Sequence, residues 1–233
     1  YFKNLIRKTL FLLGLLGLLA SCDLKLQEDI EFVPEADLVD PYDNVTAWEF
    51  IQSQIQLNEE GLIDGEQLNY MKAAIERAGM VEEYNNSSLQ ERTYLLLNNN
   101  AFIGAGDIIQ LVTGSEMVEE GETPEEVMAR ADVDVLKLIL QYHIITSYIA
   151  QVPTLFEFDV NYTFQTLIPG EDGTIALRRD NRYRIDINRS PAPLPSSATS
   201  QWERVRLHNY VFNNGIGHII ADPVRNQPYP DPQ

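Results

Sequence analysis

The chain contains 233 residues, of which 35 are Asp or Glu and 17 are Lys or Arg, and its formal net charge is −18. A chain this acidic lacks the basic face that phosphate groups require, which excludes nucleic acid as a partner. The length suits one domain of moderate size or two small ones. Because no internal repeat is present, we expect a single folded domain.

Residues 1–21 have the pattern of a secretory signal peptide. A positively charged start precedes an apolar run from Leu10 to Ala20, which is shorter than the ~20 apolar residues that cross a bilayer. The sequence Leu19-Ala20-Ser21-Cys22 resembles the bacterial lipobox, which implies that Cys22 becomes the lipidated first residue of the mature chain. Cys22 is the only cysteine and has no disulfide partner. An ordinary signal peptide and an uncleaved anchor are the alternatives.

Residues 22–42 are acidic and have no sustained period, as expected of a tether between a lipid anchor and a folded domain. We therefore place the folded domain at residues 43–225. Residues 226–233 are expected to be a short C-terminal tail.

Helices are predicted at the start of the domain. Thr46-Ala47-Trp48-Glu49 has the spacing of a capping box and precedes an apolar stripe that reaches Ile55. A second helix is expected to start near Asp64 and to run to Ala78, where Gly79 stops it.

Two more helix starts are visible in the middle of the chain. Thr123-Pro124-Glu125-Glu126 is another capping box, with proline at the first helical position. It predicts a short helix, after which Asp132 caps a second helix from Val133 to Tyr142.

The second half of the domain changes to a period of two. Apolar residues alternate with polar ones from Phe156 to Phe164, which predicts a strand whose apolar face belongs to the core. Residues 170–173 predict a turn, and residues 174–179 and 182–188 predict a hairpin across Asp180-Asn181.

Residues 190–200 are rich in Pro and Ser and are expected to form a loop. Further strands are expected at residues 202–210 and 217–221. Because helices and strands occur in separate blocks rather than in strict alternation, the sequence predicts an α+β domain.

Three segments carry recognisable motifs. Residues 93–102 read Thr-Tyr-Leu-Leu-Leu-Asn-Asn-Asn-Ala-Phe, residues 136–145 are Leu-rich and contain Tyr-His, and residues 213–222 read Asn-Asn-Gly-Ile-Gly-His-Ile-Ile-Ala-Asp. In this order and separation they resemble the fasciclin-like domain family. The first is similar to the family's Thr-Val-Phe-Ala-Pro-Thr-Asn-x-Ala-Phe box, with Leu97-Asn98 in place of Pro-Thr. The third is similar to Asn-Gly-x-x-His-x-Ile-Asp, with Asp222 one place late.

The resemblance covers about residues 43–225 and implies a single domain in which N-terminal helices pack on a β-sheet wedge or sandwich. Residues 46–54 and 75–80 are also similar to lipidated fasciclin-like proteins encoded beside glycan-uptake systems in Bacteroidetes. The resemblance therefore implies a place at the outer membrane and a role in adhesion or extracellular interaction. It also makes Tyr142 and His143 candidates for an adhesion contact.

The three histidines, His143, His208 and His218, do not have the spacing of a metal site, and no metal ligand is assigned. His143 follows an apolar helix, so we expect it to bond backbone carbonyls near that terminus, where positive charge is favourable. A structural role is expected for His218 as well. Adhesion through Tyr142-His143 is the alternative.

Motifs for catalysis and for cofactors are absent from the sequence. It contains no Gly-Lys-Ser/Thr phosphate loop, no Gly-x-Ser-x-Gly elbow and no Cys-His nucleophile pair. We therefore expect a protein without enzymatic activity and without a cofactor. A hydrolase with an atypical site would need a cleft in which carboxylates with perturbed pKa values converge.

Tyr183, Trp202 and Tyr210 border predicted strands or the Pro/Ser-rich loop. They are candidates for a sugar-binding platform, because flat aromatic rings pack on the apolar faces of sugars. The alternative is that these rings belong to the core, where most aromatic residues lie. Because loops often carry binding residues, residues 190–200 are the predicted partner surface.

These patterns together predict a lipid-anchored interaction module at the outer membrane, facing the cell surface. Its expected work is accessory to glycan capture or to a glycan-uptake complex, through contacts with a partner protein or a polysaccharide. Adhesion to a host cell or a neighbouring cell is the alternative.

Overall fold

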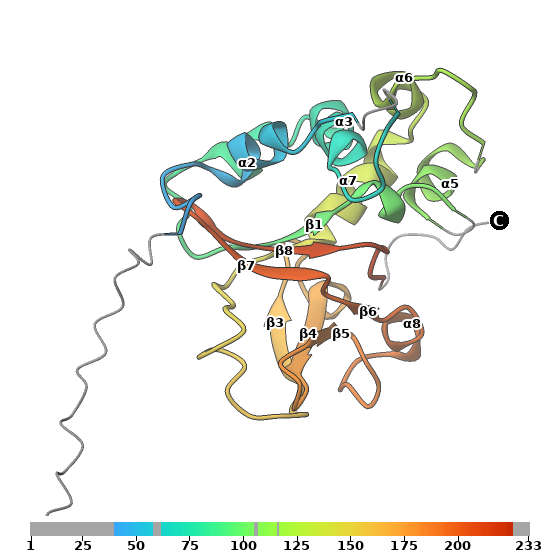
Figure 1. Ribbon diagram of the computed structural model, residues 1–233. Coiled ribbons are helices and arrows are strands. Elements are labelled where there is room, and N and C mark those ends of the chain that lie inside the picture. Colours follow the sequence, from blue (N-terminus) through green and yellow to red (C-terminus); the bar gives the residue numbers. More distant parts are fainter. Residues whose placement is uncertain (1–39, 58–61, 105–106, 116, 226–233) are drawn as a thin grey trace, which may run out of the picture. The chain divides into compact units, whose positions relative to one another are not determined.

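The computed structural model describes residues 40–57, 62–104, 107–115 and 117–225 (Figure 1). All of these residues belong to one compact unit, which begins at Val39. The predicted signal peptide, the lipidation site Cys22, almost all of the tether and the C-terminal tail lie outside the described residues.

The described part of the chain passes from a helix-rich half to a strand-rich half. Its helices are α2 (Ala47–Ser53), α3 (Asn69–Ala78), α4 (Val81–Asn85), α5 (Ile108–Thr113), α6 (Pro124–Ala129), α7 (Val133–Tyr142) and α8 (Ser196–Thr199), with 3-10 turns η1 (Asn99–Ala101) and η2 (Glu171–Gly173). Its strands are β1 (Thr93–Leu97), β2 (Ile144–Ile145), β3 (Tyr162–Gln165), β4 (Thr174–Arg179), β5 (Ile185–Ile187), β6 (Glu203–Arg204), β7 (Leu207–Phe212) and β8 (Gly215–Ile220). The α+β class predicted from the sequence is confirmed.

The predicted helix caps are present. At the start of α2, Thr46 Oγ1 accepts the N–H of Glu49 at 3.1 Å, and the Glu49 carboxylate accepts the N–H of Thr46 at 2.8 Å. Thr123 and Glu126 repeat this capping box at α6, and Asp132 caps α7. These side chains satisfy backbone N–H groups that a helix start leaves without partners.

Two helix limits differ from the prediction. The helix α2 ends before Ile55, which is 36% exposed. The helix α3 begins at Asn69 rather than near Asp64, because the Asp64 carboxylate accepts the N–H of Glu66 at 2.8 Å and forms a local turn instead. The end of α3 is as predicted, since Gly79 takes a left-handed conformation with φ of +66°.

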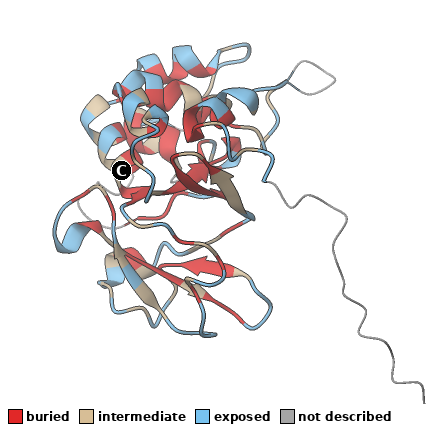
Figure 2. Ribbon diagram, turned by 90° about the vertical axis from the view of Figure 1, so that its left-hand side faces the viewer, coloured by how far each residue is buried: buried red, intermediate tan, exposed pale blue. Residues whose placement is uncertain are grey.

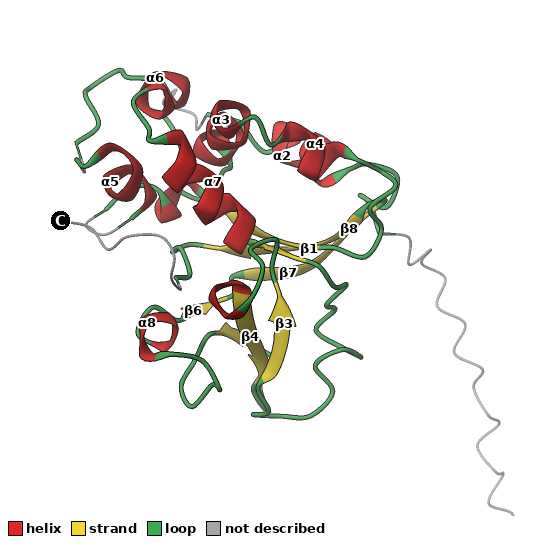
Figure 3. Cartoon of the chain, turned by 180° about the vertical axis from the view of Figure 1, so that it is seen from behind, coloured by secondary structure: helices red, strands yellow, loops and turns green. Residues whose placement is uncertain are grey.

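The first sheet has the strand order β2-β1-β8-β7. The strand β1 runs parallel to β8 and antiparallel to β2, and β7 pairs antiparallel with β8. Figures 1 and 3 show the helices α2, α3 and α7 on one side of this sheet and the second sheet on its other side. Every residue of β1 and β8 is buried, as expected of central strands that are covered on both faces.

The second sheet has the order β3-β4-β5-β6, and all of its pairings are antiparallel. The predicted hairpin is confirmed as β4 and β5, in which Leu177 lies opposite Ile187. The turn between them is closed by Asp180, whose Oδ1 accepts the N–H groups of Arg182 and Arg184 at 2.9 Å each.

The strand predicted at residues 156–164 is wrong in its first half. The strand β3 begins only at Tyr162, and the side chains of Phe156 and Phe158 are 72% and 49% exposed. Asp159 has φ of +57°, which an extended strand does not tolerate. Alternation identifies the apolar face of a segment, but among the described residues the segment before β3 has only an isolated parallel bridge, between Phe158 and Arg179, instead of a paired strand.

The expectation of one strand at residues 202–210 is also wrong. The segment crosses from one sheet to the other, so that β6 belongs to the second sheet and β7 to the first. The register of β7 against β8 shifts between Leu207 and Tyr210, and Asn209 between them has φ of +64°. The predicted loop at residues 190–200 contains the short helix α8.

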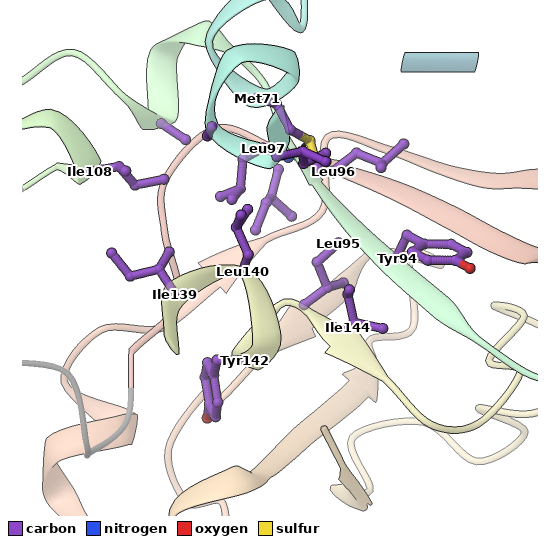
Figure 4. Packing of buried hydrophobic residues seen from close by; sticks show 14 of the residues in the cluster. Met71, Tyr94, Leu95, Leu96, Leu97, Ile108, Ile139, Leu140, Tyr142 and Ile144 are labelled. Carbon is purple, nitrogen blue, oxygen red and sulfur yellow. Dashed lines mark hydrogen bonds between the residues drawn. The ribbon is translucent and has the colours of Figure 1, made fainter. Parts of the chain in front are cut away.

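The core lies between the helices and the first sheet. Figure 2 shows the buried positions concentrated on this sheet and on the helix faces that point toward it. Figure 4 shows Met71 from α3 and Leu140 from α7 beside Leu96 and Leu97 of β1, all fully buried. Full burial of an aliphatic side chain contributes ~1.5–3 kcal/mol, so this cluster is the main source of stability in the described domain.

Candidate functional site

The three motif segments meet in the first sheet. Residues 93–102 contribute β1, residues 136–145 contribute the end of α7 and β2, and residues 213–222 contribute β8. Because β1 pairs with both β2 and β8, the segments are neighbours in space although they are far apart in sequence.

Polar side chains of these motifs are buried and tie separate segments together. Asn99 is buried and bonds backbone groups at and before the start of α3. Asn214 Oδ1 accepts the N–H of Ala47 in α2 at 2.9 Å, and its Nδ2 donates to the carbonyl of Tyr84 in α4 at 2.8 Å. Since losing one partner of a buried hydrogen bond is costly, these motif residues position the helices on the sheet.

His143 is fully buried. Its Nδ1 donates to the carbonyl of Ile139 at 2.7 Å, as expected, and its Nε2 accepts the N–H of Val224 at 3.1 Å. Burial lowers the pKa of His143 to about 4, against the opposite effect of the Ile139 carbonyl. The imidazole is therefore neutral at pH 7, and the favourable positive charge expected at the helix terminus is absent.

His218 and Tyr142 are buried in the same way. His218 Nε2 donates to the carbonyl of Ile149 at 2.8 Å and its Nδ1 accepts the N–H of Asn209 at 3.2 Å. Burial lowers the pKa of His218 to about 4 as well. The Tyr142 hydroxyl donates to the carbonyl of Thr174 at 3.0 Å, which joins α7 to the second sheet. Neither Tyr142 nor His143 is presented at the surface.

The three aromatic candidates have different surroundings. Tyr210 is half-buried, and its ring lies 5.0 Å from Phe50 and 5.9 Å from Tyr42, measured between ring centroids. Tyr183 is 52% exposed and precedes β5, whereas Trp202 is 42% exposed and lies beyond the other end of β5, beside Arg189. The predicted residues therefore do not form one platform.

Tyr183 belongs to a hollow of about 540 Å³ on the second sheet. We call it the aromatic pocket, and it is lined by Val152, Phe156, Glu157, Phe158, Arg179 and Tyr183. The sequence analysis missed Phe156 and Phe158 because their alternating pattern is typical of a half-buried strand. No signal in the sequence separates that arrangement from an exposed one.

Arg179 holds the aromatic pocket together. Its guanidinium carbon lies 4.4 Å from the ring centroid of Phe158 and 4.6 Å from that of Tyr183, and the side chain is only 3% exposed. Its Nε donates to the carbonyl of Leu155 at 2.7 Å, and its Nη2 donates to the carbonyl of Phe156. The two rings lie edge to face with centroids 5.9 Å apart, and a cation packed on an aromatic face contributes ~0.5–2 kcal/mol, so these contacts favour the observed ring positions.

Backbone strain accompanies this arrangement. Tyr183 has φ of +62° and Asp159 has φ of +57°, and both are next to or part of the pocket. Gln151 Nε2 donates to the Tyr183 carbonyl and supports the strained turn. Positive φ at residues other than glycine costs ~1–3 kcal/mol each and is frequent at functional sites.

Three carboxylates form a separate group near the end of β8. Burial and then the charge of Asp222 raise the pKa of Asp107 to about 6, and the same two causes raise the pKa of Glu203 to about 7. Perturbed carboxylates are the feature that a hydrolase would need. These residues line neither the aromatic pocket nor the hollows at residues 88–92 and beside Tyr70.

Two features are absent from the described residues. Within them, no group of three or more His, Cys, Asp or Glu residues is placed to bind a metal ion. Across the same ranges, no helix has the length and apolar character needed to cross a bilayer.

Comparisons with known proteins find similarity among solved structures. No family model matches the chain, and no curated protein matches it. Among solved structures, the chain is similar to a FAS1 domain pair from the insect cell adhesion molecule fasciclin I, with 13% sequence identity and a TM-score of 0.48. The similarity covers 78% of this chain and 51% of that one, so this chain spans about half the length of the fasciclin I chain.

Proposed function

We propose that this protein is an extracytoplasmic interaction module, anchored in the outer membrane through a lipid on Cys22 and facing the cell surface. It docks onto a partner protein as an accessory to glycan capture or to a glycan-uptake complex. The aromatic pocket carries the docking role, because Phe156 is 72% exposed, Tyr183 is 52% exposed, and the Tyr183 ring packs against the buried Arg179 guanidinium. Exposed apolar groups that gather in one place are typical of interaction sites.

The lining of the pocket favours a protein side chain over a sugar. A sugar presents hydroxyl groups around its ring and needs polar partners for them. In this pocket, Arg179 donates to two backbone carbonyls and packs against Phe158 and Tyr183, and its Nη1, which has no partner among the described residues, is buried and offers no exposed donor to a sugar. The remaining lining is largely apolar, with Val152 and Phe156 exposed, which fits an apolar side chain of a partner.

The charge around the pocket defines the partner further. Glu157 lines the pocket and Asp159 lies beside it, both exposed, and the whole chain carries a net charge of −18. Because the exposed Arg182 stands next to Tyr183, the partner surface combines an apolar anchor with charges of both signs. Such complementarity accelerates association and makes it depend on salt.

Membership of the fasciclin family and the absence of catalysis are parts of this proposal. The support for the family is the set of three motifs, whose polar residues are buried and bonded between segments. The support for a role without catalysis is that the raised carboxylates Asp107 and Glu203 lie outside the pocket that displays the exposed aromatic rings. A cell-adhesion role would use the same surface, and the identity of the captured partner separates the two.

Loss of two exposed rings should abolish docking. We expect the double variant Phe156→Ser, Tyr183→Ser to lower the recovery of the partner at least tenfold in a crosslinking pull-down from the protein's own cells. Met117→Ser is the matched control, because Met117 is also 72% exposed but lies far along the chain in a loop before α6. A transporter or glycan-binding lipoprotein as the lost partner supports the proposal, and a host-surface or neighbouring-cell protein supports adhesion instead. Equal recovery with both variants contradicts docking through the pocket.

The lipid anchor predicts a change of location. We expect Cys22→Ala to move the protein from the membrane fraction to the soluble fraction and to remove incorporation of labelled palmitate. The physical reason is that acyl chains supply the membrane affinity, at ~0.8 kcal/mol for each buried CH₂ group. A variant that still sediments with membranes would show that Cys22 is not the anchor.

A further inference from the structure

Positive charge is concentrated in one part of this acidic chain. Residues 174–206 contain seven arginines and three carboxylates, a net charge of +4, whereas the whole chain carries −18. These residues form β4, β5, β6 and the connections between them. The second sheet is therefore a local cationic region on a protein that repels anions elsewhere.

Three of these arginines surround one buried carboxylate. Asp186 on β5 lies opposite Arg178 on β4 and opposite Arg204 on β6 in the strand register. Its Oδ1 accepts from Arg204 Nε at 2.8 Å, its Oδ2 accepts from Arg189 Nη1 at 2.7 Å, and Arg178 Nη2 lies 3.5 Å from Oδ2. Asp186 is fully buried beneath these side chains.

The three arginines outnumber the one carboxylate that they contact, although the charges of Asp180 and Glu203 also act on Arg204. The side chains of Arg189 and Arg204 are 37% and 31% exposed, and each uses a single N–H group for Asp186. Among the described residues, their other N–H groups have no hydrogen-bond acceptor, and Arg178 Nε is buried without a partner. Guanidinium groups held in place with free N–H groups are suited to bind an anion in a bidentate manner.

Trp202 completes the group. The guanidinium carbons of Arg189 and Arg204 lie 4.8 Å and 5.7 Å from the centroid of its ring, and Trp202 is 42% exposed. The ring orients the guanidinium groups and offers an apolar surface beside them. An apolar flat surface next to a fixed cation matches a pyranose ring that carries an acidic substituent.

We propose that Trp202, Arg189 and Arg204 form a binding site for an acidic unit of a glycan, here called the cationic platform. The acidic group of the sugar bonds the free N–H groups of the two arginines, and the apolar face of the sugar ring packs against Trp202. A carboxylate of a uronic acid and a sulfate ester share this chemistry. The proposal deepens the glycan-capture part of the proposed function and rests on it for the choice of a glycan as the ligand.

Calorimetric titration of the full chain in neutral detergent tests this site. The probes are a hexamer of galacturonic acid, the same hexamer as its methyl ester, dextran sulfate and unmodified dextran. We expect the acidic hexamer, dextran sulfate or both to bind, with an affinity that falls as salt is raised, and the neutral probe of the same backbone to bind at least tenfold more weakly. Binding of the hexamer alone identifies a carboxylate ligand, and binding of dextran sulfate alone identifies a sulfate ligand.

Variants locate the binding on the platform. Arg189→Gln leaves Asp186 paired with Arg178 and Arg204, and Trp202→Ala removes an exposed ring, so both should fold. Each should weaken binding of the acidic probe at least fivefold, while Arg130→Gln, which removes another exposed arginine, should not. Equal binding by these variants, equal binding of the methyl ester, or no binding of either acidic probe would overturn the proposal.

These experiments can reject either proposal without rejecting the other. Phe156→Ser, Tyr183→Ser should bind the acidic probe as the unchanged protein does, because Tyr183 and Trp202 lie beyond opposite ends of β5. Arg189→Gln should retain the protein partner. A variant that loses probe binding but keeps the protein partner, or the reverse, therefore shows which surface binds the glycan and which binds the protein.

Discussion

Gly215→Val is expected to lower the free energy of unfolding by about 3–5 kcal/mol. Gly215 has φ of +148°, and a Cβ atom there would lie 2.3 Å from the carbonyl oxygen of Arg92 and 3.0 Å from the Tyr94 ring. The Arg92 carbonyl cannot move away freely, because it accepts the N–H of Ile216 at 2.9 Å and leads into the central strand β1. Backbone strain and overpacking cost about 1–3 kcal/mol each.

Chemical denaturation of the purified protein measures this effect. Gly121→Val is the matched control, because Gly121 also has positive φ, +84°, but has no atom within 4 Å of its Cβ position. We expect the control to lose only the strain, about 1–3 kcal/mol. If Gly215→Val does not fold, Gly215→Ala gives the same comparison with a smaller side chain. Equal losses at the two glycines would contradict the close approach to β1.

Acid should destabilise the protein through its two buried histidines. Burial lowers the pKa of both His143 and His218 to about 4, whereas an unfolded histidine has an ordinary value of 6.5. Their neutral forms stabilise the fold fully above pH 6.5. Between pH 6.5 and pH 4 the unfolded chain binds protons that the folded chain does not, so this contribution is lost as pH falls, at about 1.4 kcal/mol per pH unit and per histidine.

A comparison of variants isolates this effect. The raised pKa values of Asp107 and Glu203 have the opposite consequence, because the folded protein keeps their protons and loses stability as pH rises toward 6 and 7. We therefore compare His143→Gln with the unchanged protein at pH 7 and at pH 4.5, and expect the difference in unfolding free energy to shrink by about 2–3 kcal/mol at the lower pH. His208→Gln should change the profile in the same direction but less, because burial lowers the pKa of His208 although the residue lies at an exposed position. If the difference in unfolding free energy between the two proteins is the same at pH 7 and at pH 4.5, the fold does not lower the pKa of His143, and this side chain is charged in the folded state at pH 4.5.

The two proposed binding surfaces give the second sheet a role that the first sheet does not have. The motif residues in the first sheet are buried and bonded to backbone, so they define the fold rather than a contact surface. The rings of Phe156 and Tyr183 and the cationic platform lie on the strands and turns of the second sheet. We therefore expect relatives with the same motifs but different residues on the second sheet to bind different partners.

Features that depend only on neighbouring residues follow from the amino-acid sequence. The capping boxes at Thr46 and Thr123, the helix from Asp132 to Tyr142 and the stop at Gly79 appear as predicted. Each of them is a set of hydrogen bonds or a backbone conformation within about one helical turn, so the local residues are enough to specify it. The same holds for the hairpin of β4 and β5, which a short turn closes.

Which side chains are covered and which are exposed depends on contacts between segments that are distant in sequence. The alternating residues of the segment 156–164 indicate an apolar face, but only the fold, in which the segment before β3 makes a single bridge to Arg179, shows that Phe156 and Phe158 are exposed. The neutrality of His143 depends on its burial beneath Val224, which is distant in sequence. The cluster of arginines at Asp186 is visible as a charge excess in the sequence, yet the register of β4, β5 and β6 brings these side chains to one carboxylate. Burial, charge state and convergence are properties of contacts between distant segments, and a local pattern does not contain them.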